Sequence, residues 1–234
     1  MGMLRSLSRH LPNLPLRVHP PFSSSSFSSS TLSNTSYIEE WQKNVMKTNE
    51  FYEMHASNRV YFYTVDLVGR LFLEETHPKN IATSLKSTKF LDFFFKQMRR
   101  NDTYEHGDYP YYSPCGKEHN YIRPADTGIV FHEFLNGSEL VFGGSLREPF
   151  SGDDLAYSER TGRFYHRLSD GGKAKLQNGT EYGLIKSSVA GQIADQIEFG
   201  EEGDMYYNNN MGAESKIRLL PREQESERWG LPPT

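Results

Sequence analysis

Residues 60–75 read VYFYTVDLVGRLFLEE, and this stretch is the clearest hairpin signal in the chain. Residues 60–65 and 70–74 are rich in β-branched and aromatic side chains, which favour strands. Residues 66–69 lie between them and contain the aspartate and glycine that are typical of a tight turn. The sequence therefore predicts a β-hairpin here.

Three other stretches have the periodicity of amphipathic helices. Apolar side chains recur on one face of residues 89–102, and Ser87 and Thr88 precede them as a helix cap. Residues 187–200 place an aliphatic side chain every four positions and end in a glycine, which favours helix termination. Residues 38–52 have a less regular pattern of the same kind. We expect a helix over each of these stretches.

Short segments bounded by Gly, Pro, Asn or Asp predict the remaining strands. They are residues 109–113, 119–123, 128–134 and 139–142, a hairpin over 158–168 that turns at 161–162, and a last pair at 205–207 and 215–220. Turns separate most of these segments, and only two or three helices intervene. We therefore expect an α+β fold with a mainly antiparallel sheet, two or three packed helices and a single domain.

The first 37 residues differ from the rest, and we expect them to be a disordered organelle transit peptide. They contain no Asp or Glu, three arginines spread among leucines, and the serine tract FSSSSFSSS at residues 22–30. This composition is typical of mitochondrial and chloroplast leaders. Prolines and arginines interrupt the apolar core that a secretory signal needs. We expect the mitochondrial matrix as the location, with the chloroplast as the alternative.

We expect three further parts of the chain after this leader. Residues 38–58 are interpreted as a linker or short helix, residues 59–220 as the globular α+β domain, and residues 221–234 as a flexible tail.

Charge and composition exclude several classes of function. Without the three leader arginines, the 26 basic residues fall to 23 against 30 acidic ones, and the net charge goes from −4 to −7. A nucleic-acid binder normally has the opposite balance. The single cysteine excludes an internal disulfide and any site built from several thiolates of one chain. No apolar run approaches the roughly 18 residues of a membrane helix, so we expect a soluble protein without membrane insertion.

Residues 111–131, YYSPCGKEHNYIRPADTGIVF, hold a dense group of polar side chains. Cys115 is followed four residues later by His119, and a working cysteine needs a base or a cation beside its sulfur. Residues four apart can face each other across a short hairpin turn. An enzyme, hydrolytic or thiol-dependent, that uses Cys115 and His119 with Glu118 nearby is therefore the alternative function, although the signatures of known cysteine hydrolases do not match.

A structural interpretation of the same stretch is a β-turn at residues 114–117 between two strands. Pro114 suits the second position of a turn, and Gly116 tolerates a positive φ. The lone thiol would then lie at a bend whose shape matters more than its reactivity.

Four polar residues near this turn, together with His166 farther along the chain, are candidates for ligand binding. We expect Glu118, Arg123 and Asp126 to form a charge network across adjacent strands. Asn120 is expected to brace the loop through backbone hydrogen bonds. An aromatic-rimmed polar cluster of this kind can be structural or can receive a ligand, and His166 is a further candidate.

Motifs for metal and phosphate binding are incomplete. His132 and Glu133 begin like the zinc motif HExxH, but Asn136 stands where the second histidine is required. The glycine pairs at 143–144 and 171–172 lack the spacing and the following lysine of a phosphate loop. We therefore expect neither a metal nor a cofactor.

Ordered blocks along the chain resemble a known family. VYFYTVDLVGRLFLEE, KFLDFFF, YYSPCGKEHNYIRPAD, GRFYH and GLIKSSVA occur in this order between residues 59 and 199. The most specific block is the Ser-Pro-Cys-Gly-basic-Glu-x-Asn-aromatic-aliphatic-Arg run at residues 113–123. The chain is similar to an uncharacterised eukaryotic family whose human member is an open-reading-frame protein encoded on chromosome eight. The resemblance implies a mitochondrial protein and carries over no activity, cofactor or catalytic residue.

The absence of a complete catalytic motif favours a non-enzymatic function. We expect a binding or interaction module whose partner is an unknown protein or a small-molecule ligand.

Overall fold

The computed structural model describes five ranges of the chain: residues 46–102, 105–169, 182–200, 203–209 and 214–220. The expected leader at 1–37, the expected tail at 221–234 and the glycine pair at 171–172 lie outside these ranges.

The first sheet has the strand order β2-β1-β5-β4-β3. Its members are β1 (Val60–Val65), β2 (Leu71–Leu73), β3 (Arg99–Arg100), β4 (Tyr111–Cys115) and β5 (Glu118–Pro124). The predicted hairpin at residues 60–75 is confirmed, because β1 and β2 pair antiparallel. Asp66 holds its turn by accepting the backbone N–H groups of Val68 and Arg70 at 3.0 and 2.9 Å. Strand β5 lies parallel to β1 on the other side.

Helix α3 (Thr88–Gln97) covers one face of the first sheet. The hydroxyl of Ser87 accepts the N–H of Phe90, so the predicted cap is confirmed. Phe94 and Phe95 are the buried side chains of this helix. The expectation that this helix runs to residue 102 is wrong, because Arg99 and Arg100 adopt extended backbone and pair with β4.

A second sheet has the order β16-β10-β11-β12-β6. Its members are β6 (Val130–Phe131), β10 (Leu155–Ser158), β11 (Arg163–Arg167), β12 (Tyr182–Ile185) and β16 (Arg218–Leu219). Strands β10 and β11 form a hairpin whose turn includes the expected residues 161–162, and Gly162 takes a φ of +65° there. The first strand was expected to begin at Ser158, but it ends there and residues 159–162 form the turn. Strand β6 pairs parallel with β12, so the chain leaves the first sheet and enters the second here.

Two antiparallel three-stranded sheets complete the described part of the chain. They consist of β7 (Glu133–Leu135), β8 (Glu139–Phe142) and β9 (Leu146–Pro149), and of β13 (Ile197–Phe199), β14 (Met205–Asn208) and β15 (Glu214–Lys216). The prediction at 139–142 therefore has the observed bounds of β8. The strand expected over 128–134 is split between β6 and β7, and the sequence did not indicate β9 or β12.

Two predicted helices have different bounds in the structure. Helix α2 (Asn49–Ser57) begins after Thr48, whose hydroxyl accepts the N–H of Phe51, so residues 46–48 are not helical. Helix α4 (Ser187–Ile193) passes into the 3-10 turn η2 (Ala194–Gln196). The expectation that it continues to residue 200 is wrong, because Ile197 already belongs to strand β13 and pairs with Tyr207 of β14. A second 3-10 turn, η1 (Gly152–Asp154), precedes β10.

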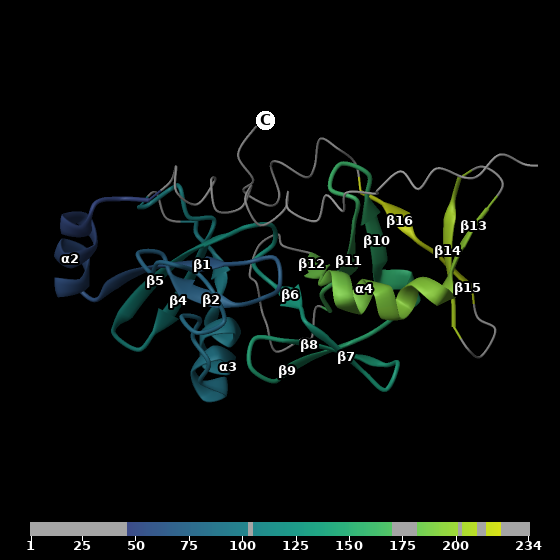
Figure 1. Cartoon of the computed structure of the whole chain (residues 1–234), viewed down its shortest axis with the longest axis horizontal. Coiled ribbons are helices and arrows are strands. Elements are labelled where there is room, and N and C mark those ends of the chain that lie inside the picture. The colour runs from purple at the N-terminus through teal and green to yellow at the C-terminus, as the bar shows by residue number, and fades with distance from the viewer. Residues whose placement is uncertain (1–45, 103–104, 170–181, 201–202, 210–213, 221–234) are drawn as a thin grey trace, which may run out of the picture.

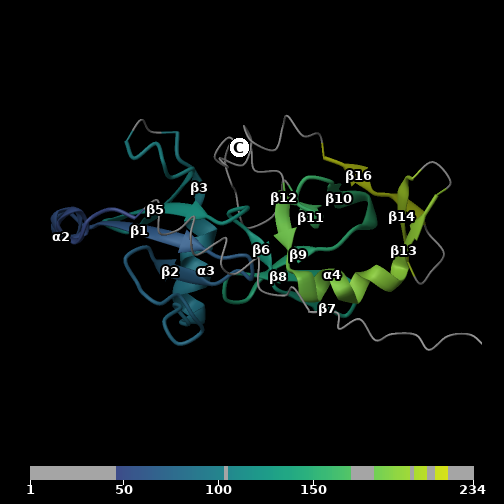
Figure 2. The same ribbon diagram turned by 45° about the horizontal axis from the view of Figure 1, so that its top comes forward.

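The two large sheets share one hydrophobic core, which includes Tyr63 and Phe94 at one end and Leu184 and Ile217 at the other. A separate aromatic cluster of Tyr52, Phe62, Tyr109 and Tyr121 lies on the opposite face of the first sheet, under α2. Figures 1 and 2 show an elongated molecule with α2 at one end, β13–β15 at the other and β6 between the two large sheets. The α+β class with mostly antiparallel strands is confirmed.

In the ranges that the structure describes, no helix is long and apolar enough to cross a bilayer.

Candidate functional site

The β4–β5 hairpin contains most of the predicted site residues. Its turn lies at Gly116 and Lys117, because Cys115 pairs directly with Glu118. Gly116 has a φ of +69°, as expected for the first central residue of a type II′ hairpin turn. The turn expected at residues 114–117 is therefore wrong by one position, and Pro114 lies within β4 opposite His119.

Cys115 and His119 lie on opposite faces of this hairpin. Residues directly opposite each other on paired strands share a face, and neighbours along a strand alternate. Cys115 lies opposite Glu118, so the next residue, His119, points to the other side. There its Nδ1 lies 2.7 Å from the hydroxyl of Tyr112. The structure does not bring the sulfur and the imidazole together.

The Cys115 sulfur lies on the side of α3, in a surrounding that keeps it protonated. Burial, assisted by the charge of Glu118, raises the pKa of the thiol above its ordinary value. Its Sγ is 3.6 Å from the hydroxyl of Ser113, which donates to the carbonyl of Phe94. Asn120 donates to the carbonyl of Ser113 at 2.8 Å, so its expected bracing role is confirmed.

The expected charge network of Glu118, Arg123 and Asp126 does not form. Arg123 pairs with Glu74 at 2.7 Å, whereas the carboxylate of Asp126 lies 2.7 Å from Arg163. Side chains that are close in sequence therefore have separate partners from different strands.

His166 lies in the second sheet, apart from this hairpin. Its Nε2 accepts the backbone N–H of Ser151 at 3.1 Å, and burial lowers the pKa of its imidazole.

No three His, Cys, Asp or Glu side chains in the described ranges are grouped so that they could hold a metal ion.

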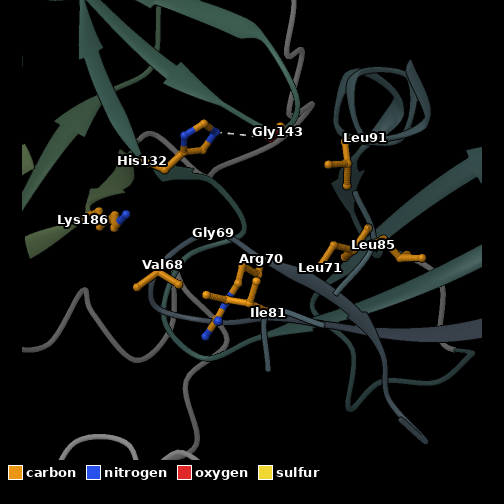
Figure 3. A pocket seen from close by; sticks show the side chains of 10 residues that line it. All are labelled: Val68, Gly69, Arg70, Leu71, Ile81, Leu85, Leu91, His132, Gly143 and Lys186. Carbon is orange, nitrogen blue, oxygen red and sulfur yellow. Dashed lines mark hydrogen bonds between the residues drawn. The ribbon is translucent and has the colours of Figure 1, made fainter. Parts of the chain in front are cut away.

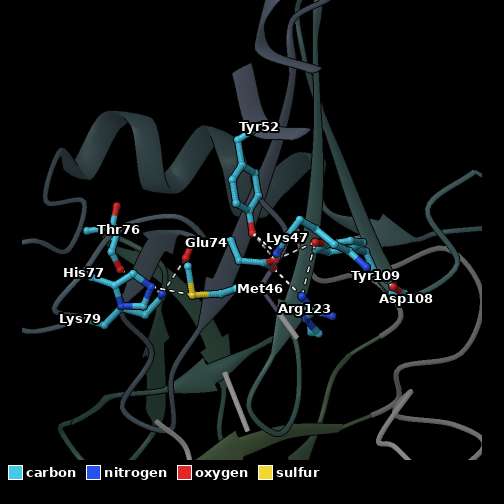
Figure 4. A network of polar contacts seen from close by, with 10 residues as sticks. All are labelled: Met46, Lys47, Tyr52, Glu74, Thr76, His77, Lys79, Asp108, Tyr109 and Arg123. Atoms are coloured by element: carbon cyan, nitrogen blue, oxygen red, sulfur yellow. Dashed lines mark hydrogen bonds and ion pairs between the residues drawn. The ribbon is translucent and has the colours of Figure 1, made fainter. Parts of the chain in front are cut away.

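Glu74 is the centre of a buried polar network that joins α2 to the first sheet (Figure 4). One of its oxygens accepts from the hydroxyls of Tyr52 and Tyr109, each at 2.8 Å, and the other from Arg123. The guanidinium also lies 4.6 Å from the centre of the Tyr109 ring. Burial raises the pKa of both tyrosines far above the ordinary value, so they stay protonated and donate. Both carboxylate oxygens have protein partners, which indicates a structural role.

A pocket of about 520 Å³ opens where the β1–β2 turn meets segments from the second half of the domain. Its lining comes from six separate parts of the chain: Val68, Gly69, Arg70 and Leu71 of the turn and β2, Ile81 and Leu85 of the following loop, Leu91 of α3, His132 after β6, Gly143 after β8, and Lys186 after β12. Figure 3 shows the three leucines together on one side of the pocket and Lys186 on the opposite side.

Gly69 allows the β1–β2 turn to lie close to strand β6. Its φ of +86° is accessible to glycine, and a Cβ at this position would lie 3.3 Å from both Cβ and O of Val130 in β6. The turn of the first sheet therefore rests directly against the strand that leads into the second.

The polar side of the pocket is basic. Lys186 makes no ion pair within the described ranges, and none of the described lining residues is an Asp or Glu. Arg70 uses its Nε for a 2.6 Å contact with Asp66. The Nε2 of His132 is 3.2 Å from the carbonyl of Gly143, which can only accept, so this nitrogen carries the proton. Burial lowers the pKa of His132, so the imidazole is neutral at pH 7.

A comparison with protein families gives the identity of the domain. The sequence profile described as "Domain of unknown function (DUF4505)" matches residues 52–220, which is most of the chain. The chain belongs to the DUF4505 family. Its membership agrees with the resemblance to an uncharacterised family, whereas the human member and the mitochondrial location stay predictions.

One solved structure is similar to the DUF4505 chain at low identity. It is the crystal structure of a DUF1285 family protein from Silicibacter pomeroyi DSS-3, with 13% sequence identity and a TM-score of 0.42. The match covers 80% of the present chain and 96% of that chain. A likeness of this degree carries no conclusion about function.

Sequence reasoning missed the pocket of the DUF4505 domain. In the sequence, His132 and Gly143 stand in incomplete motifs, and Lys186 stands in the GLIKSSVA block. No local pattern could have found the set, because its members are up to 118 positions apart, from Val68 to Lys186.

Proposed function

We propose that this DUF4505 chain is a non-enzymatic binding module that holds a small molecule in the pocket of Figure 3. The observation that carries the proposal is the pocket itself, whose volume of about 520 Å³ is typical of small-molecule sites, roughly 300–1,000 Å³. Its lining also combines the kinds of side chain found in such sites, since five of the ten lining residues are aliphatic and Arg70, His132 and Lys186 are polar.

The positions of the catalytic candidates support binding over thiol chemistry. Cys115 has its pKa raised by burial, and His119 faces away from it across the sheet. A nucleophilic cysteine needs a lowered pKa and an adjacent base. The enzyme alternative therefore lacks the activated pair on which it depends.

The expected location of this function is the mitochondrial matrix. The support is the acid-free, arginine-containing and serine-rich composition of residues 1–37. The test is to fuse these residues to a fluorescent protein and to compare it with a fusion of residues 38–234. Import of the first fusion alone into mitochondria is expected, import into chloroplasts would support the alternative, and a diffuse signal from both would refute targeting.

Nuclear magnetic resonance of the full chain tests the proposed binding function directly. We expect a panel of small amphiphiles to contain members that shift the backbone amide signals of Gly69, Leu85 and Lys186 in a saturable manner. Leu85→Trp places a bulky ring in the pocket and should abolish these shifts. Leu219→Trp is the matched control, because Leu219 is exposed in β16, outside the pocket.

The outcome that refutes the proposal is equally specific. Shifts that are absent for every compound, or that persist unchanged in Leu85→Trp, would show that the pocket does not bind small molecules.

A further inference from the structure

We propose that the pocket selects an amphipathic carboxylate, with its acidic headgroup at Lys186 and its aliphatic tail against Leu71, Leu85 and Leu91. This inference rests on the proposed function and names the chemical class of the ligand.

The charge of the pocket favours an anion over a neutral or cationic ligand. Lys186 has no carboxylate partner in the described ranges, and its ammonium contributes three hydrogen-bond donors. Arg70 reaches Asp66 through Nε, which leaves the terminal nitrogens of its guanidinium for a second acceptor. With no Asp or Glu among the described lining residues, a carboxylate would be attracted and an ammonium repelled.

His132 contributes to the shape of the pocket and not to its charge. Its Nε2–H is already used by the carbonyl of Gly143. Burial, and after it the positive charge of Lys186, lowers the pKa of this imidazole. The attraction for an anion therefore comes mainly from Lys186, because Asp66 already balances the charge of Arg70.

The opposite side of the pocket provides a surface for a short aliphatic chain. Leu85 and Leu91 are half-buried, and Leu71, which also lines the pocket, is buried. Ile81 also lines the pocket and has 70% of its surface exposed, so it adds apolar surface that a ligand can cover. A tail that runs from Lys186 toward the leucines would cover this apolar surface, as the separation of the two sides in Figure 3 indicates.

Three probes of similar length and different charge test the ligand class. Octanoate, 1-octanol and octylammonium are titrated separately into the full chain, and the dissociation constants are measured from amide shifts. We expect octanoate to bind most tightly and octylammonium least. Shortening octanoate to hexanoate removes two methylenes, and each is expected to weaken binding by about fourfold.

Substitutions at Lys186 test the position of the headgroup. Lys186→Gln should weaken octanoate binding by about tenfold, the loss expected for one charge-assisted hydrogen bond, and leave octanol binding unchanged. Lys186→Glu should reverse the order, so that octylammonium binds better than octanoate. Lys89→Gln is the matched control, because Lys89 is an exposed lysine of α3 outside the pocket.

The results separate this inference from the proposed function. Equal binding of the three probes, abolished by Leu85→Trp, would overturn the carboxylate preference and retain the pocket as a binding site. Unchanged octanoate affinity in Lys186→Gln and Lys186→Glu would overturn the headgroup position. Absence of binding by the three probes would overturn the carboxylate inference, and absence of binding by the whole panel of amphiphiles would overturn the proposed function as well.

Discussion

Glu74 and Arg123 form a buried ion pair across the first sheet, with Oε2 of the carboxylate 2.7 Å from Nη2 of the guanidinium. Only 2% of the Glu74 side chain and 6% of the Arg123 side chain are exposed. The other oxygen of Glu74 accepts from Tyr52 of α2 and from Tyr109. One carboxylate therefore connects the covering helix, the end of β2 and strand β5.

Replacing Glu74 by alanine should be strongly destabilising. Arg123 would keep a buried charge without its carboxylate, and removing one partner of a buried pair costs about 3–5 kcal/mol. The measurement is the free energy of unfolding in urea. Glu139→Ala is the control, because Glu139 pairs with Arg147 on the surface, where such pairs contribute about 0–1 kcal/mol. Equal losses in the two variants would show that the buried network has no special role.

A valine at Gly116 should destabilise the β4–β5 hairpin. The φ of +69° is strained for a β-branched residue, at a cost of about 1–3 kcal/mol. Nothing lies within 4 Å of a Cβ at this position, so the loss would come from backbone strain alone. Gly107→Val is the control, since that site is also open and lacks a positive φ. A melting temperature that is equal to that of the parent chain would contradict the turn geometry.

Cys115→Ser should preserve both stability and ligand binding. A hydroxyl can keep the contact with Ser113, and we expect a change in unfolding free energy within about 1 kcal/mol. In the parent chain, the rate of alkylation by iodoacetamide should reach its midpoint at a higher pH than for a free cysteine peptide, because burial raises the pKa of this thiol. A lower midpoint, or loss of a turnover or ligand in Cys115→Ser, would restore the thiol function.

Acidification should weaken the fold below neutral pH. Burial lowers the pKa values of His106, His132 and His166 in the folded chain, whereas the unfolded chain titrates near the ordinary value of about 6.5. The unfolded state then binds more protons, so stability is full above pH ~6.5 and falls as the pH decreases below it.

The slope of unfolding free energy against pH between 7.5 and 5.5 measures this effect. His166→Gln should reduce the slope, because the Nε2 of His166 accepts a backbone N–H and cannot take a proton without losing that bond. A slope of zero in the parent chain would contradict neutral buried imidazoles.

Local sequence chemistry predicted the elements that depend on neighbours in the chain. The hairpin at residues 60–75 follows from two runs of β-branched and aromatic residues on either side of a turn that contains Asp66 and Gly69. Asp66 accepts two backbone N–H groups of this turn. The α3 cap at Ser87 and the bracing bond of Asn120 are equally local, since each joins groups within seven positions. Tertiary contacts changed the helix ends, as when pairing with Tyr207 placed Ile197 in a strand.

Sequence patterns alone were enough to predict the α+β class, the first hairpin and helix α3, and to show that no local catalytic or metal motif is complete. Long-range packing was needed to show that Cys115 and His119 face opposite ways, that Arg123 and Asp126 have different partners, and that Lys186 and Leu91 line one pocket. The physical reason is that turn and helix signals act over a few residues. The face on which a strand residue points, and the neighbours it meets, depend on the register and packing of strands far apart in the chain.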